Sequence, residues 1–231
     1  MKVLLAGQKY FGASVFRALR EINGVEITAI SAPVRNEKPD RLFALGETYG
    51  VPIIPAGSLN AGTMPSDIDL IVAAHSHDFI GQKTRMRARF GGIGYHPSLL
   101  PLHRGRDAVR WAIIMGDKIT GGTVYRLSNK TDGGNIILQR FVFIPPRVDA
   151  TELWRSSLAP LGVSLLCKAV EAFRDHGFIN GVPQDEKLAT WEPSIDRPPL
   201  FKPDLLQIPF DTKNVSDENK CVYGTLDDNE V

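Results

Sequence analysis

The feature that most constrains the fold is an alternation, over the first 75 residues, of short apolar runs with helical patterns. Mostly apolar runs at 3–6, 25–30, 51–54 and 70–74 predict strands, and apolar residues at helical spacing over 11–22 and 41–49 predict helices. Continuously apolar strands joined by helices predict a parallel sheet that is covered on both faces. We therefore expect an α/β fold, a Rossmann-like, doubly wound, mostly parallel sheet with helices on both faces.

After this parallel sheet, the sequence predicts an antiparallel pair of strands, then a long helix, and then a change of composition. A helix over 106–115 is followed by strands over 121–127 and 136–144, which we expect to pair antiparallel around the 128–134 loop. A long amphipathic helix over 151–175 follows, with Thr151 as its N-cap and Pro160 kinking or dividing it. We expect a catalytic-type domain over 1–180 and a short C-terminal extension over 181–231, Pro-rich and then acidic and loosely held.

Composition excludes some partners and favours a compartment. The 231 residues carry 27 basic and 26 acidic side chains, and this near-neutral balance gives no general electrostatic attraction to nucleic acid or to an anionic membrane. We read no signal-like segment and no membrane-spanning run. Cys167 and Cys221 fit no metal or redox spacing. The expectation is a cytoplasmic protein without a membrane anchor.

Two motifs favour simple structural interpretations. The segment from Gly7 to Gly12 lacks both the G-x-G-x-x-G spacing and a terminal Gly-Lys-Ser/Thr, so we interpret it as a strand-to-helix turn. His75 and His77 could share a metal with His96 or His103, but no cysteine or carboxylate follows at ligand spacing. We predict no metal site, and a pocket wall at the end of the 70–74 strand.

His96 and Asp132 are the candidate catalytic pair. His96 ends an apolar, Gly-rich strand-like segment, and Asp132 begins a Gly-Gly turn before the 136–144 strand. Ligands of doubly wound sheets bind beyond the carboxyl ends of the strands, where His75, His96 and Asp132 are expected to lie. A titratable imidazole at a strand end, paired with a carboxylate, suits acid–base chemistry.

A run of short elements around this pair resembles the folate-dependent formyltransferase family, which includes glycinamide ribonucleotide, methionyl-tRNA and sugar-nucleotide amine formyltransferases and the formyltetrahydrofolate hydrolases. The resemblance extends from residue 1 to about 175 and is densest over 90–139. Its elements occur in the family's order: His96-Pro97-Ser98-Leu99-Leu100-Pro101, Arg104-Gly105, Gly116-Asp117-Lys118, Thr120-Gly121, Thr123-Val124 and Asp132-x-Gly134-x-Ile136-Ile137.

The resemblance implies a reaction and roles for residues. A formyl group would pass from 10-formyltetrahydrofolate, the formyl donor, to a primary amine. His96 would act on the oxyanion or as the acid–base group, and Asp132 would orient it and help to move protons. The donor would be surrounded by residues 79–90 and held by His75, His77, Phe79, Leu127, Ser128, Asn129, Lys130 and Thr131.

The chain departs from the family pattern at two positions. The family carries an asparagine two residues before the histidine, where this chain has Gly94, and loss of one oxyanion donor typically costs about a hundredfold to a thousandfold in rate. Some members carry a histidine where this chain has Tyr125. The hydroxyl of Tyr95 or Tyr125, the His103 imidazole or a water are alternative donors. Gly94→Asn is expected to raise the rate if Gly94 is the only defect, and not if the pocket is rebuilt around glycine.

The acceptor is expected to be a small-molecule amine, for example a nucleotide-linked amino sugar, rather than nucleic acid. About fifty residues follow Asn180 and they are acidic near the end, which disfavours RNA. The sequence leaves three functions open: an active formyltransferase with a modified oxyanion site, a formyltetrahydrofolate hydrolase, and a catalytically impaired folate- or nucleotide-binding protein. It also leaves a homodimer open. Trp191 is interpreted as a packing residue.

Overall fold

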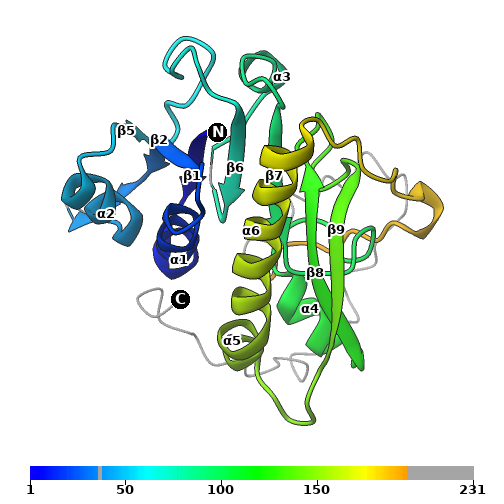
Figure 1. The fold of residues 1–231 in the computed structure, drawn as a ribbon. Helices are drawn as coiled ribbons and strands as arrows, with labels where there is room; N and C mark the ends of the chain where they lie inside the picture. The colour runs from blue at the N-terminus through cyan, green and yellow to red at the C-terminus, as the bar shows by residue number, and fades with distance from the viewer. Residues whose placement is uncertain (36–37, 77, 197–231) are drawn as a thin grey trace, which may run out of the picture. The chain divides into compact units, whose positions relative to one another are not determined.

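The computed structural model describes residues 1–35, 38–76 and 78–196, and the chain divides into two units, Met1–Glu192 and Pro193–Val231. The first unit is built on a seven-stranded sheet (Figure 1). In spatial order its strands are β5 (Ile53–Pro55), β2 (Glu26–Ala32), β1 (Lys2–Gly7), β6 (Leu70–Ala74), β7 (Gly92–His96), β8 (Ile119–Arg126) and β9 (Ile136–Phe143). The short strands β3 (Val34–Arg35) and β4 (Lys38–Pro39) form a separate antiparallel pair.

The helices are α1 (Lys9–Arg20), α2 (Arg41–Tyr49), α3 (Gln82–Arg85), α4 (Ala108–Ile114), α5 (Ala150–Leu153) and α6 (Ala159–His176). The strands from β5 to β7 are parallel, whereas β8 and β9 are antiparallel to their neighbours. This confirms the expected mostly parallel, doubly wound sheet and its terminal antiparallel pair. The strand order reverses between β1 and β6, beside the strand that carries His96, and such a switch point opens a crevice for ligands.

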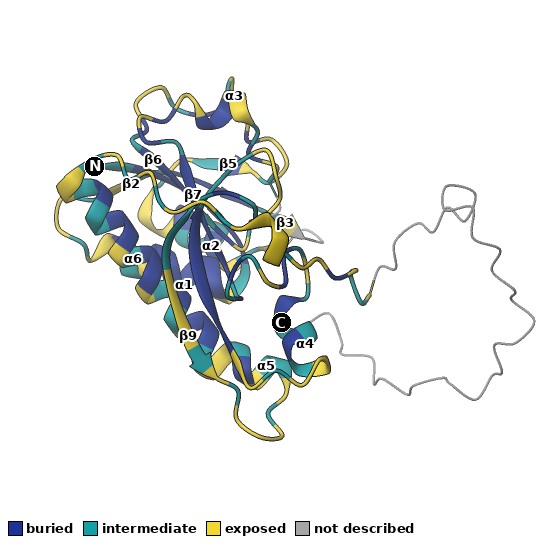
Figure 2. Ribbon diagram, turned by 90° about the vertical axis from the view of Figure 1, so that its right-hand side faces the viewer, coloured by how far each residue is buried: buried dark blue, intermediate teal, exposed yellow. Residues whose placement is uncertain are grey.

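Successive residues of β1 point into two different apolar layers. Val3 and Leu5 face the layer formed with α1 and α6, whereas Leu4 and Ala6 face the layer below the 56–69 connection and α3. A strand buried on both faces must be apolar at every position, which explains the continuous apolar run in the sequence. Long helices cover the first face (Figure 2), and the second is covered largely by irregular chain and the short helix α3.

The N-cap of the long helical segment lies two residues before the expected one, and the α-helix is interrupted before its proline. Asp149 is the cap, since its carboxylate accepts a hydrogen bond from the Glu152 N–H, so the prediction of Thr151 at this position was wrong. A π-helical turn over Trp154–Leu158 joins α5 to α6, and Pro160 lies in the first turn of α6, where no helical partner for its nitrogen is needed. The proline therefore marks a division of the segment, as predicted.

The combined segment Ala150–His176 is long and apolar enough, by length and composition alone, to cross a membrane. Leu166, Val170 and Phe173 of α6 are fully buried in the core against the sheet. Core helices meet the same length and composition test, and the absence of a membrane partner stays a prediction.

The compact unit continues beyond the expected domain boundary at residue 180. Val182 exchanges two backbone hydrogen bonds with Ile136 at the start of β9, and Arg104 forms a bridge with Trp191. Residues 181–192 are therefore part of the unit that contains the sheet. The expected loose tail over 197–231 lies outside the described residues.

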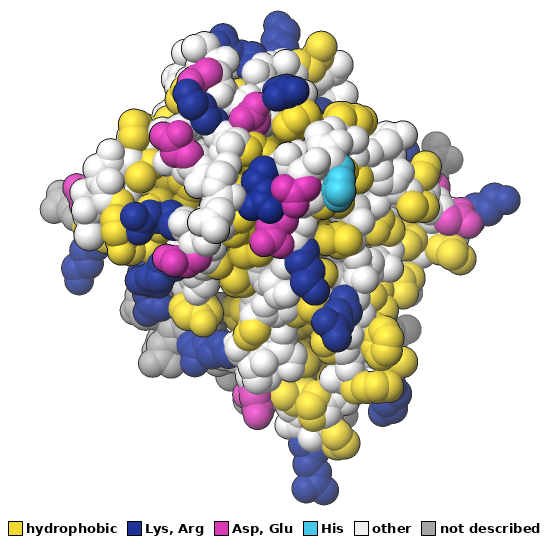
Figure 3. Space-filling model, in the orientation of Figure 1, with side chains coloured by type: hydrophobic (Ala, Val, Ile, Leu, Met, Phe, Trp, Pro, Cys, Tyr) yellow, Lys and Arg dark blue, Asp and Glu magenta, His cyan; other side chains and the backbone are white. Residues whose placement is uncertain are grey.

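The β9 edge of the sheet is exposed. Ile119, Phe141 and Phe143 are among its exposed apolar side chains, and the two phenylalanine rings meet edge to face with centroids 5.6 Å apart. Apolar side chains gather at this part of the molecule in Figure 3. The strands β1, β6 and β7 in the middle of the sheet are almost completely buried.

A tight contact between helix and sheet can be tested at Gly162 in α6. A Cβ there would lie 2.6 Å from the Tyr95 ring, which cannot move away because it is buried and its hydroxyl donates to the Leu158 carbonyl. Gly162→Ala is expected to lower the free energy of unfolding by about 1–3 kcal/mol. Urea unfolding checks this, with the exposed Ser164→Ala as control. Equal stability of both variants would contradict the contact.

Candidate active site

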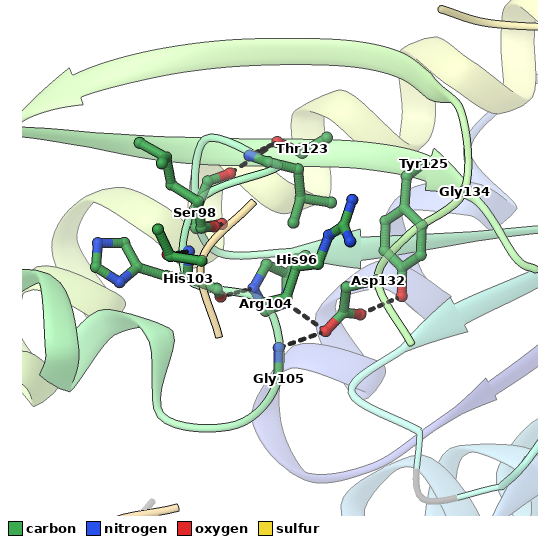
Figure 4. A network of polar contacts seen from close by, with 12 residues as sticks. His96, Ser98, His103, Arg104, Gly105, Thr123, Tyr125, Asp132 and Gly134 are labelled. Carbon is green, nitrogen blue, oxygen red and sulfur yellow. Dashed lines mark hydrogen bonds and ion pairs between the residues drawn. The ribbon is translucent and has the colours of Figure 1, made fainter. Parts of the chain in front are cut away.

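The two predicted catalytic side chains meet at the end of β7. His96 is the last residue of β7, and Asp132 comes from the loop between β8 and β9 (Figure 4). His96 Nδ1 lies 3.6 Å from Asp132 Oδ2, and the two side chains are only 7% and 11% exposed. This distance is too long for a direct hydrogen bond. It suits an ion pair, or proton transfer through a third group that contacts both side chains. The structure thus brings together two residues that are 36 positions apart in the sequence.

The other ring nitrogen of His96 fixes the tautomer. Its Nε2 lies 2.6 Å from the backbone oxygen of His103, and a carbonyl only accepts, so Nε2 carries the proton and donates it. In the neutral ring the lone pair is then on Nδ1, the atom that faces Asp132. A histidine oriented in this way can take up a proton on the side of the carboxylate.

The Asp132 carboxylate is held from two sides. Its Oδ2 accepts the Gly105 backbone N–H at 2.8 Å, and its Oδ1 accepts the Tyr125 hydroxyl at 2.6 Å. The Asp132 backbone has φ 50°, in the left-handed region that aspartate tolerates better than most residues. Two residues later a Cβ at Gly134 would lie 1.7 Å from the Arg126 carbonyl oxygen, so only glycine fits there. The turn therefore directs the carboxylate toward His96.

Tyr125 occupies the space beside Gly94. The two residues are paired across β7 and β8, and a Cβ at Gly94 would lie 3.3 Å from the Tyr125 hydroxyl oxygen and 3.1 Å from Leu127 Cδ2. Burial, followed by the charge of Asp132 and the hydrogen bond to it, raises the pKa of Tyr125 well above 10. Tyr125 therefore keeps its proton at physiological pH and remains a donor.

The other alternative donors have different partners. Tyr95 donates to the Leu158 carbonyl on the helix side of the sheet. The His103 imidazole lies between Asp117, at 2.9 Å, and Glu192, at 3.1 Å. Among the protein groups considered from the sequence, only the Tyr125 hydroxyl contacts the reactive pair.

The His-Pro-Ser-Leu-Leu-Pro turn is held by buried hydrogen bonds. The Thr123 hydroxyl, from β8, donates to the Ser98 carbonyl at 2.7 Å and accepts the Leu100 N–H at 3.2 Å. Gln139 of β9 donates to the same hydroxyl oxygen and to the Leu100 carbonyl. Thr123 and Ser98 are completely buried. These bonds fix the chain that follows His96 and hence the carbonyl of His103 that orients it.

An open cavity of about 560 Å³ lies at the start of β7, where Gly91 and Gly92 form part of its wall. Its walls come from two segments, 82–92 and 126–129, together with Phe178. Gly92 of β7 and Leu127 both line the cavity, and Leu127 also approaches Gly94, so the strand that carries His96 forms part of the cavity wall. Arg85 joins the two walls, since its guanidinium donates to the Ile80 carbonyl and to Asn129 Oδ1. The volume is typical of small-molecule sites.

Some of the residues predicted to bind the formyl donor line the cavity, and others are exposed on the surface. Leu127, Ser128 and Asn129 line the cavity, as does most of the 79–90 segment from Gln82 onward. Phe79 is 80% exposed, and His75, Lys130 and Thr131 are exposed as well. His77 lies outside the described residues. No sequence pattern indicated Gln184, whose amide donates to the backbone oxygens of Asp132 and Gly134.

In the part of the chain that the structure describes, no group of three or more His, Cys, Asp or Glu side chains converges as metal ligands would. His103 has its two carboxylate neighbours on opposite ring nitrogens, so they do not face a common point.

The fold and the site define an α/β protein with a buried histidine–aspartate pair at the end of β7 and an open cavity at the start of the same strand. Residues 59–170 match the family described as formyl transferase. Human mitochondrial 10-formyltetrahydrofolate dehydrogenase is 31% identical over 202 residues, which are 83% of this chain and 22% of that protein. Methionyl-tRNA formyltransferase of Thermotoga neapolitana is 28% identical over 87% of this chain and 67% of that protein.

Solved structures have the same fold. Phosphoribosylglycinamide formyltransferase from Bacillus halodurans aligns with a TM-score of 0.63 at 18% identity, over 76% of this chain and 96% of that one. The sugar 3N-formyltransferase WlaRD aligns with a TM-score of 0.67 at 16% identity, over 85% of this chain and 71% of that one. The matched family and these relatives are folate-dependent formyltransferases, and the matched segment 59–170 is just under half of this chain. It spans less than a quarter of the length of the dehydrogenases that it matches.

The filled space beside Gly94 gives a prediction. Gly94→Asn places side-chain atoms against Tyr125 and Leu127, and we expect it to lower the free energy of unfolding by about 1–3 kcal/mol and not to raise activity. Adding Tyr125→His makes room, so the double variant is expected to be more stable than the sum of the single changes predicts. Urea unfolding of the four proteins measures the coupling. A stable Gly94→Asn variant with increased activity would show that the space is open.

Proposed function

We propose that this domain transfers the formyl group of 10-formyltetrahydrofolate to a primary amine of a small acceptor. The observation that carries the proposal is the buried His96–Asp132 pair at the end of β7, the strand whose first residue lines the cavity. The family supports formyl transfer as the reaction class.

The cavity walls suit a folate. Phe90, Leu127 and Met86 offer apolar surface to a flat pterin ring, and Arg89 offers a cation to the carboxylates of its tail. When bound, the folate supplies an activated formyl group. We assign Leu127, Ser128 and Asn129 to its binding on their position, whereas Phe79, His75, His77, Lys130 and Thr131 stay sequence predictions. A structure of a sugar N-formyltransferase from Helicobacter canadensis contains folinic acid, and at 17% identity its likeness shows the fold.

The pair supports proton transfer from the acceptor nitrogen. An amine attacks a carbonyl only when neutral, and it must lose a proton as the new C–N bond forms. His96 Nδ1 accepts this proton, and the Asp132 carboxylate at 3.6 Å stabilises the imidazolium. His96 then returns the proton to the nitrogen that leaves. One C–N bond forms, one breaks, and the proton moves between the two nitrogens.

Tyr125 is the candidate replacement for the family's asparagine. Its hydroxyl lies beside Gly94, keeps its proton, and holds Asp132 at 2.6 Å. Its single O–H is donated to Asp132, so we assign it the task of keeping the carboxylate in place.

The burial of the pair favours a slender acceptor. With 7% and 11% of the two side chains exposed, a primary amine reaches them more easily than a more substituted amine. An amino sugar linked to a nucleotide is the acceptor class that we propose, in a cytoplasmic protein, while a net charge of +1 gives no support to nucleic acid.

Hydrolysis of the same donor is the second candidate. Several relatives at 30–32% identity are 10-formyltetrahydrofolate dehydrogenases, whose name gives the same one-carbon donor without an amine acceptor. With water in place of the amine, His96 and Asp132 would produce formate. Binding without turnover is the outcome expected of a catalytically impaired member.

One assay distinguishes these candidate functions. Incubation with 10-formyltetrahydrofolate and a panel of amines, including nucleotide-linked amino sugars, is expected to give amine-dependent transfer. His96→Ala and Asp132→Asn are each expected to lower kcat by about 10²–10⁴, because proton transfer is lost. His176→Ala, an exposed histidine at the end of α6, is the control and should retain full activity.

Formate release that does not depend on the amine would favour the hydrolase, and binding without product would favour the impaired member. Transfer that survives both His96→Ala and Asp132→Asn would contradict the assigned pair.

A further inference from the structure

The segment 182–192, which follows α6 in sequence, crosses both loops that carry the reactive groups; we refer to it as the strap. It begins on β9, where Val182 pairs with Ile136, and ends on the turn after β7. There the Thr190 N–H donates to the Pro101 carbonyl, and the Thr190 carbonyl accepts the Arg104 N–H. The strap therefore connects the 101–105 turn with the loop that contains Asp132.

Gln184 is the centre of this connection. Its side-chain nitrogen donates to the backbone oxygens of Asp132 and Gly134, both at 2.7 Å. Its side-chain oxygen accepts from Arg104 Nε at 3.1 Å and from Arg104 Nη2 at 2.7 Å. A primary amide has two N–H donors and one oxygen with two lone pairs, so all its hydrogen-bonding capacity is used.

Arg104 completes the link to His96. It is 6% exposed, and its guanidinium also binds Glu186 of the strap at 3.0 Å. In the sequence it lies between His103, whose carbonyl orients the His96 ring, and Gly105, whose N–H binds the Asp132 carboxylate. One amide side chain thus joins the backbone that holds the imidazole to the backbone that holds the carboxylate.

The position of Asp132 depends on this support. Its left-handed backbone sits in the nine-residue loop 127–135 between β8 and β9, in which Lys130 and Thr131 are exposed. Gln184 fixes the loop at Asp132 itself and two residues later. Displacement of a catalytic group by about 1 Å can cost a hundredfold in rate.

We propose that Gln184, held by Arg104, is a positioning residue that sets the separation of His96 and Asp132. The proposal rests on the proposed function, since it assigns a role in the chemistry of that same pair. Gln184 does not reach the reacting atoms; it acts through the backbone of the Asp132 loop.

Gln184→Glu removes the N–H donors of the amide and keeps an oxygen that can accept from Arg104. Glutamate has the same shape and still accepts from Arg104, but it has no N–H for the oxygens of Asp132 and Gly134 and faces them with a negative charge. The expected result is a fall in kcat of about a hundredfold with an unchanged KM for 10-formyltetrahydrofolate. Lys187→Gln, an exposed position on the same strap, is the matched control and should leave both constants unchanged.

A second measurement does not need activity. The Gly105 amide reports on its bond to Asp132 Oδ2, so its resonance in ¹H–¹⁵N spectra is expected to shift and its hydrogen exchange to accelerate in Gln184→Glu but not in Lys187→Gln. Circular dichroism shows that each variant is folded at the assay temperature. If Gln184→Glu does not fold, Gln184→Met, which removes the same donors without adding charge, replaces it in both measurements.

Native kcat together with a native Gly105 amide in the folded variant would overturn the positioning role. If the unmodified protein neither transfers the formyl group nor releases formate, the proposed function fails, and the Gly105 amide still decides whether Gln184 positions Asp132.

Discussion

The interaction on which the site depends is the pair of hydrogen bonds that hold the Asp132 carboxylate, one from the Gly105 N–H and one from the Tyr125 hydroxyl. A carboxylate that is 11% exposed needs such donors, because removal from water is costly unless its oxygens are bonded. The donors also determine direction, since they leave Oδ2 facing His96. The three groups come from a turn, a strand and a loop, so the site exists only when β7, β8 and their connections are assembled.

The two departures from the family pattern, Gly94 and Tyr125, are explained together by side-chain volume. Neighbouring strands bring residues that are directly opposite within contact distance, and a small residue on one strand leaves room for a large one on the other. Gly94 leaves that room, and the Tyr125 ring fills it. In this position the Tyr125 hydroxyl reaches Asp132 and donates a hydrogen bond to its carboxylate. The glycine is therefore part of a rearranged pocket.

The same principle extends to the strap. A loop with a left-handed aspartate and a required glycine is not rigid through its own sequence, and here its carbonyl oxygens are bound by the amide of a residue some fifty positions later. Arg104 is buried because that amide and Glu186 satisfy its guanidinium. Buried polar groups that are fully bonded in this way make a structure rigid and specific.

The sequence by itself predicted most strands of the seven-stranded sheet and the helices α1, α2 and α4, though not β3, β4 or α3, and it proposed His96 and Asp132 as the catalytic pair. Continuous apolar runs separated by helical patterns permit few arrangements other than a covered parallel sheet, and the spacing of His96, Arg104, Gly105 and Asp132 carried the family resemblance. These are local patterns, which periodicity and residue type reveal. The N-cap at Asp149 was missed because Thr151, two residues later, is an equally good capping residue by type.

Only the tertiary structure decided which groups meet. It paired Tyr125 with Gly94, turned His96 through the His103 carbonyl, and placed Gln184 on the Asp132 loop. It also placed residues 181–192 within the compact unit, although their composition resembles a linker. The physical reason is that side-chain hydrogen bonds across 27 to 80 positions follow from the register of strands and the path of loops. A sequence pattern read over short windows contains neither.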